Sequence, residues 1–97
     1  MFYVKFHKAE GRTIVAICDG DLLGKKFSAN GMKLEISERF FNGERKSRKE
    51  VEDVLRNCDN LNLVGKNIIE LAVSIGIVDR ENVKFVDNVP HVLVVGL

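Results

Sequence analysis

The segment KNIIELAVSIG, residues 66–76, constrains the fold more than any other. At helical spacing only Lys66, Glu70 and Ser74 form a polar stripe, and apolar side chains occupy most of the remaining surface. A helix that is apolar on most of its sides is buried in a core. Gly76 is placed to end the helix in the left-handed conformation. We therefore expect a mostly buried helix.

Several short segments have the alternation of β-strands. Residues 2–7 place Phe2, Val4 and Phe6 on one face, AEGR then turns the chain, and TIVAICD follows, so residues 2–19 are expected to form a β-hairpin. Asn30-Gly31 predicts a second hairpin because both residues tolerate the positive φ of a type I′ turn. The segment LNLVG is a short strand or a loop. VKFV and HVLVV are expected as closing strands, with Pro90 at a strand start.

Another helix is expected after residue 47. Ser47 and Glu50 have the spacing of a capping box, in which each side chain accepts a hydrogen bond from the other residue's backbone N–H. The apolar positions that follow have the spacing of one buried stripe: Val51, Val54, Leu55 and Cys58.

These elements predict one α+β domain over residues 1–97, with a mainly antiparallel sheet of about five strands and two helices packed on one face. The hydrophobic fraction of 45% suffices for one modest core. No apolar run approaches the roughly 20 residues that span a bilayer. The first residues lack a signal-peptide pattern. We expect a cytoplasmic protein without a membrane partner.

The sequence favours neither metal binding nor catalysis. Cys18 and Cys58 lie far apart in sequence and are expected to be small buried hydrophobes, while His7 and His91 stand alone. No spacing joins a nucleophile, a base and an oxyanion donor. We expect no catalytic residues, no metal site and no cofactor, although catalytic groups from distant segments can still meet in space.

The stretch DGDLLGKKFS, residues 19–28, resembles a phosphate-binding loop but differs from it in spacing. Only three residues separate Gly20 from Gly24, Lys26 stands where a Ser or Thr is required, and a hairpin is expected to follow in place of a helix. We expect no nucleotide at residues 20–28. The segment LVGKN, residues 63–67, is also expected to be only a helix start with its glycine turn.

Basic residues are concentrated in the first half of the chain. Residues 1–49 hold eleven Lys and Arg against six Asp and Glu, a net charge of +5, although the whole chain carries only +1. Four cations crowd the start of the helix after Ser47 as a candidate anion or nucleic-acid surface: Arg45, Lys46, Arg48 and Lys49. Lys25 and Lys26, from the stretch 19–28, extend this surface if the fold brings them close. The alternative is a solvated helix face with ion pairs four residues apart, Arg48 with Glu52 and Lys49 with Asp53.

Aromatic residues give a weaker indication of nucleic-acid binding. Tyr3 and the pair Phe40-Phe41 are the candidates for stacking on bases, and one of the pair is expected to face outward if its segment is extended. Packing in the core is the more common role of such phenylalanines.

Four landmark segments in order resemble a family of small single-domain archaeal proteins, the domain of unknown function numbered four hundred and twenty-four: YVKFHKAEGRTIVAICDGDLLGKKFS, LEISERFFNGE, NLVGKNIIELAVSIGIV and VPHVLVV. The resemblance covers nearly the whole chain. It implies a stand-alone cytoplasmic archaeal protein, in some cases loosely associated with RNA or translation, and no established activity. The positions that it singles out are Gly24, Lys25, Asn42, Gly43, Pro90 and His91.

The basic residues lead to the hypothesis of a non-catalytic module that contacts RNA or a ribonucleoprotein through phosphates. The alternative is a protein-interaction or homodimerisation module. Its contact surface would be the apolar second helix or the C-terminal strand HVLVV at a sheet edge.

Overall fold

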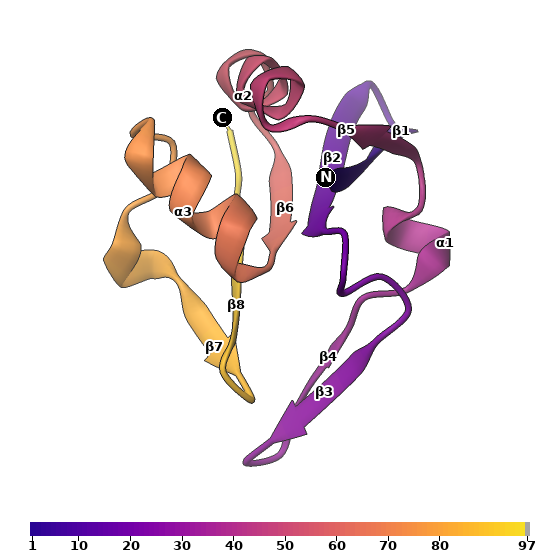
Figure 1. The fold of residues 1–97 in the computed structure, drawn as a ribbon. Coiled ribbons are helices and arrows are strands. Elements are labelled where there is room, and N and C mark those ends of the chain that lie inside the picture. The colour runs from indigo at the N-terminus through magenta and orange to yellow at the C-terminus, as the bar shows by residue number, and fades with distance from the viewer. Residues whose placement is uncertain (97) are drawn as a thin grey trace.

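The computed structural model describes residues 1–96 and has a six-stranded sheet with its two longer helices on one face (Figure 1). The strands lie in the order β5-β1-β2-β6-β8-β7. Their bounds in chain order are β1 Phe2–Ala9, β2 Arg12–Asp19, β5 Glu44–Lys46, β6 Leu61–Val64, β7 Lys84–Val86 and β8 Val89–Val94. Two further strands, β3 Lys26–Ala29 and β4 Met32–Glu35, form a separate hairpin.

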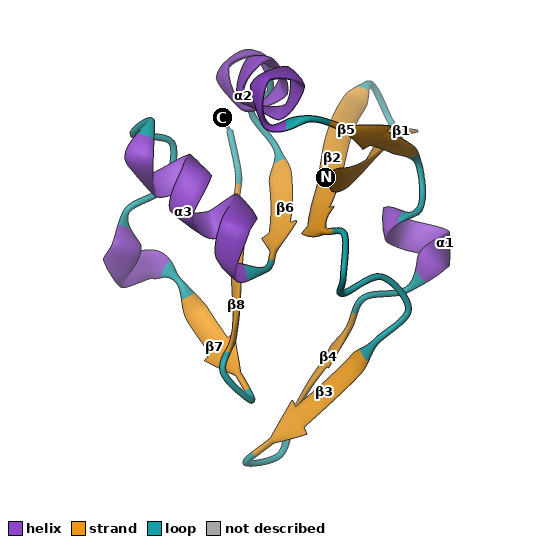
Figure 2. Cartoon of the chain, viewed as in Figure 1, coloured by secondary structure: helices purple, strands orange, loops and turns teal. Residues whose placement is uncertain are grey.

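The helices are α1 Glu38–Phe41, α2 Arg48–Asn57 and α3 Lys66–Ser74, with one 3₁₀ turn at Arg80–Asn82 (Figure 2). The α+β class and the two longer helices are confirmed. The expected counts are wrong, because the main sheet has six strands and a third helix precedes β5. None of these helices is both long enough and apolar enough to cross a membrane.

One neighbouring pair in the sheet is parallel, β2 with β6, and every other pair is antiparallel. After β2 the chain builds the β3–β4 hairpin and α1, adds β5 at the edge of the sheet beside β1, and passes through α2 before it reaches β6. This long crossover brings β6 back in the direction of β2. As a result, the ends of β2 and β6 lie side by side, and the segments that follow both strands meet at one edge of the sheet.

One face of the sheet packs against α2 and α3. The buried side chains of this layer come from both helices and from strands β1, β2, β6 and β8, and they include Val4, Ile17, Leu55, Leu63 and Ile68. The apolar residues of α3 pack in this layer, which confirms the expected burial of that helix. Gly76 follows it with φ +79°, in the left-handed conformation that was predicted.

The opposite face is covered by the β3–β4 hairpin and α1. Cys18, Ile36 and Phe41 are buried in this second cluster. The segment around Phe40-Phe41 is a short helix capped by Ser37, whose Oγ accepts from the Phe40 N–H at 3.2 Å. Phe41 therefore points into the core, while Phe40 is half-buried.

The tight turns follow the local sequence signals. Asn30 and Gly31 both have positive φ, +54° and +80°, as the type I′ prediction requires. Asp87 and Asn88 take the same conformation between β7 and β8, with φ of +49° and +65°.

Candidate functional site

Four of the six predicted cations lie together. Arg45 and Lys46 belong to the edge strand β5, which pairs with the start of β1, and Arg48 and Lys49 form the first turn of α2. Arg45, Arg48 and Lys49 are exposed, and Lys46 is half-buried. We call the three exposed residues the basic surface.

The start of α2 is capped as predicted. Ser47 Oγ accepts from the Glu50 N–H at 3.3 Å, and Glu50 Oε1 accepts from the Ser47 N–H at 2.9 Å. The hydrogen bond that the Ser47 N–H donates to the carboxylate lowers the pKa of Glu50. An anion bound here would therefore be held mainly by the cationic side chains, since the box already uses two backbone N–H groups.

No residue of the basic surface forms an ion pair with an acidic residue in the described part of the chain. Among residues 1–96 the ion pairs are Lys46 with Glu44 at 3.1 Å and Arg80 with Glu70 at 2.7 Å. The pairs expected for a solvated helix face, those of Arg48 and Lys49 with acidic residues one turn later, do not form within 4.0 Å. The Arg45 guanidinium lies over the Tyr3 ring, 5.8 Å from its centroid.

Lys25 and Lys26 lie elsewhere. Lys26 begins β3 and Lys25 precedes it, and Figure 1 shows this hairpin at the opposite end of the molecule from β5 and α2. The fold therefore divides the six predicted residues into two groups.

The loop after β2 uses its backbone amides internally. The Leu22 N–H donates to the Asp19 carbonyl at 3.1 Å, the Gly24 N–H to the Ile36 carbonyl at 2.7 Å, and the Lys25 N–H to the Leu22 carbonyl at 3.0 Å. Strand β3 follows where a phosphate-binding loop would lead into a helix. The absence of a nucleotide at residues 20–28 remains a prediction.

Asp19 is a buried carboxylate whose role the sequence analysis missed. It ends β2, is 5% exposed, and accepts from the N–H groups of Asn67 and Ile68, each at 2.9 Å. These N–H groups belong to the first turn of α3, so Asp19 caps a helix 48 residues further along the chain. Burial raises the pKa of Asp19, and the two hydrogen bonds offset part of that rise. The available signals were an Asp directly after an apolar strand and a helix start without a capping side chain of its own.

Gly65 makes this cap sterically feasible. It has φ +123°, and a Cβ at this position would lie 2.3 Å from Asp19 Cγ. The segment LVGKN is a strand–glycine–helix junction as predicted, and its first helical amides are already occupied by a protein carboxylate.

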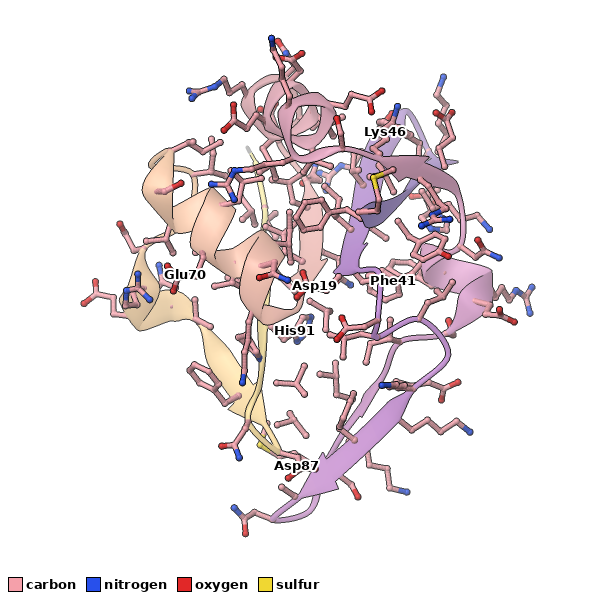
Figure 3. All side chains as sticks on the ribbon, viewed as in Figure 1. Asp19, Phe41, Lys46, Glu70, Asp87 and His91 are labelled. Carbon is pink, nitrogen blue, oxygen red and sulfur yellow. The ribbon has the colours of Figure 1, made fainter. Side chains whose placement is uncertain are left out.

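A cavity of about 380 Å³ opens beside this cap, between the loop after β2, the start of α3 and the β7–β8 turn. Figure 3 shows Asp19 at the start of α3 and Asp87 in that turn. Four exposed charged residues line the cavity, Asp21, Lys25, Lys66 and Asp87, and its apolar part is formed by Leu22, Phe27, Val89 and Pro90.

The two histidines have neutral partners. His91 Nε2 lies 3.0 Å from Asn62 Oδ1, and burial lowers the pKa of His91. His7 Nε2 lies 2.8 Å from the Phe40 carbonyl, and the two rings stack at 4.4 Å. Residues 1–96 contain no group of three or more His, Cys, Asp or Glu side chains arranged to hold a metal ion.

Residues 7–97 match the model of a family described as "Protein of unknown function (DUF424)". The chain belongs to this family. The family's description assigns no activity to its members, so the function of this chain has to be inferred from its own residues.

A similar solved structure is the crystal structure of an uncharacterized conserved protein from Methanopyrus kandleri. It is 24% identical, with a TM-score of 0.76, over 95% of this chain and 88% of that one. This likeness supports the fold. No curated protein matches the sequence.

Two of the positions singled out by the family resemblance have clear structural roles. Gly43 packs against β1 so closely that a Cβ would lie 2.1 Å from the Val4 carbonyl oxygen. Gly24 has φ +84° in the loop after β2. Lys25 and Pro90, by contrast, both line the cavity.

Proposed function

We propose that this chain is a non-catalytic module that contacts the phosphates of RNA, free or in a ribonucleoprotein, through Arg45, Arg48 and Lys49. The observation that supports the proposal is that three neighbouring cations are exposed and none of them is paired with a carboxylate in the described part of the chain. Lone cations near a helix N-terminus are slightly unfavourable for the helix itself. A bound phosphate would relieve that repulsion.

The other predicted cations have smaller parts in this proposal. Lys46 is already held by Glu44, so its charge is partly neutralised. Lys26 begins β3 and Lys25 lies in the loop before it, so neither belongs to the basic surface on β5 and α2. The contact is therefore small, about three phosphates, and it positions RNA without reading its sequence.

The test is the binding of labelled cellular RNA across a salt series. The wild type is compared with a variant that carries Arg45→Gln, Arg48→Gln and Lys49→Gln. The matched control carries Lys25→Gln, Lys26→Gln and Lys33→Gln, which removes the same charge from three exposed hairpin residues. About three contacts on a single strand give a log–log salt slope near −2.

We expect the first variant to lose binding and the control to keep both its affinity and its slope. If the two variants weaken binding equally, only the net charge matters and the basic surface is not the contact. If the wild type does not bind at low salt, the RNA proposal is wrong.

A second candidate function, a protein-interaction or homodimer module, rests on the C-terminal half of β8. Strand β7 pairs only with Val89–His91, and beyond that point the side chains of Leu93 and Val95 are 60% and 68% exposed. A hollow of about 300 Å³ runs between this part of β8 and the segment after α3. An open strand edge with apolar side chains is a site where another strand can pair.

Helix α3 does not provide this surface, because Ile68, Leu71 and Ala72 are fully buried in the core. Light scattering of the wild type and of a Leu93→Lys variant tests the edge as a homodimer contact. A dimer that Leu93→Lys converts to a monomer supports it, and a wild-type monomer at high concentration argues against self-association.

A further inference from the structure

The cavity beside Asp19 has no part in the proposed RNA contact, and four exposed charged side chains line it. Asp21, Lys25, Lys66 and Asp87 come from three separate segments. None of the four forms an ion pair in residues 1–96. Asp19 also lines the cavity, but its carboxylate already caps α3. Apart from Asp19, the fold places two positive and two negative groups around one opening without joining them in ion pairs.

The start of α3 does not make this cavity a simple anion site. The Asn67 and Ile68 N–H groups are occupied by Asp19, whose negative charge also compensates the positive end of the helix. An anion bound beside Lys25 and Lys66 would meet Asp21 and Asp87 as well. A plain cation would face the two lysines, so neither kind of simple ion matches the full set of charges.

The cavity also has an apolar part. Leu22, Phe27, Val89 and Pro90 line it, and both Val89 and Pro90 are buried. Its volume of about 380 Å³ is at the lower end of the range for small-molecule sites. A matching ligand is small, carries one charge of each sign and has an apolar group.

We propose that this cavity binds a free α-amino acid with an apolar side chain. Lys25 and Lys66 hold the carboxylate, and Asp21 and Asp87 hold the ammonium group. The apolar side chain lies against Phe27 and Pro90. The site is non-covalent, and the side-chain amides of Asn67 and Asn88 add polar groups at its edge.

The test is a titration of the full chain, followed by backbone amide NMR shifts, with L-leucine and L-phenylalanine as probes. Two analogues separate the charges: N-acetyl-L-leucine keeps the carboxylate only, and L-leucinamide keeps the ammonium only. A charged hydrogen bond contributes roughly 1.5–3 kcal/mol, so each analogue should bind at least about tenfold more weakly than L-leucine.

Two variants test the assignment of the charges. Lys66→Gln and Asp87→Asn should each weaken L-leucine binding about tenfold. Asn is compatible with the positive φ at position 87, so the turn is retained. The matched controls are Lys26→Gln and Asp79→Asn, which change exposed residues outside the cavity and should leave binding unchanged.

Amide shifts confined to residues 19–27, 66–67 and 87–89 would support the proposal if the affinity they report falls about tenfold in both cavity variants and is unchanged in both controls. It is overturned if neither amino acid shifts these resonances at millimolar concentration. It is also overturned if N-acetyl-L-leucine or L-leucinamide binds as tightly as L-leucine, because the site would then select a single charge.

Discussion

Replacement of Asp19 by Ala is the most direct test of how this fold is held together. The carboxylate joins the end of β2 to the first turn of α3 by two hydrogen bonds of 2.9 Å. In the Ala variant the Ile68 N–H, which is buried, loses its only partner, and the half-buried Asn67 N–H must turn to water. We therefore expect a large loss of stability from one exchange.

The magnitude follows from three contributions. A buried donor without a partner costs about 1–3 kcal/mol. The loss of a helix cap costs about 1 kcal/mol, which overlaps with the first contribution. Burial desolvates the carboxylate and so raises the pKa of Asp19. The Ala variant no longer has this desolvation cost, which offsets part of the loss of stability. We expect the free energy of unfolding to fall by about 1–3 kcal/mol, a large share of the roughly 5–15 kcal/mol of a typical domain.

The measurement is urea unfolding followed by circular dichroism at neutral pH. The control is Asp21→Ala, which removes an exposed carboxylate from the same loop and should change stability by less than about 0.5 kcal/mol. Asp19→Asn keeps one acceptor oxygen and should fall between the two. If Asp19→Ala costs no more than Asp21→Ala, the reasoning is refuted and the cap contributes nothing to stability.

Three further predictions follow from the same structure. First, burial holds the pKa of Asp19 above its ordinary value, so the stabilising contribution of the protonated group is fully present below about pH 3.9 and is lost as pH rises through the raised native pKa. The difference in unfolding free energy between the wild type and Asp19→Asn should therefore narrow as pH rises through that window. A widening of this difference would contradict the prediction. Second, Gly43→Ala should lower the free energy of urea unfolding by about 3 kcal/mol, because its Cβ would meet the backbone of β1 at 2.1 Å. Gly24→Ala has open space around its Cβ and should cost only about 1 kcal/mol, for its positive φ. Equal costs would show that the close approach at Gly43 is easily relaxed. Third, a thiol-reactive chromophore should modify Cys58 alone in the native protein and both cysteines in urea, because Cys18 is fully buried and burial raises its pKa to about 12. If the native Cys58→Ser variant still reacts, Cys18 is accessible and this prediction is wrong.

Much of the local structure of this chain could be predicted from its sequence. The capping box of Ser47 and Glu50, the turn at Asn30-Gly31 and the end of α3 at Gly76 all formed as expected. Each depends on residues within one turn of one another, where a side chain's preferred conformation and its nearest backbone partners decide the outcome. The burial of α3 was predictable too, because a helix that is apolar on most of its sides must pack in a core.

The relations between distant segments were decided only by the tertiary structure. No local pattern indicates that β6 returns parallel to β2. The direction of β6 is set by a crossover of 41 residues between the two strands, which is beyond the reach of any short-range signal. That pairing brings Asp19 to Asn67 and places Lys25 beside Lys66 at the cavity. Lys25 and Lys26 were expected to extend the cations at the start of α2 only if the fold brought them close, and the β3–β4 hairpin lies apart from β5 and α2 (Figure 1).

The candidate sites divide along the same line. The sequence by itself determined that cations gather at the start of α2, since neighbours in a strand and a helix turn remain neighbours in space. Whether those cations find acidic partners depends on side-chain geometry in the folded protein, which leaves Arg48 and Lys49 unpaired. The cavity depends wholly on the fold, because its charges come from three segments that only long-range packing brings together.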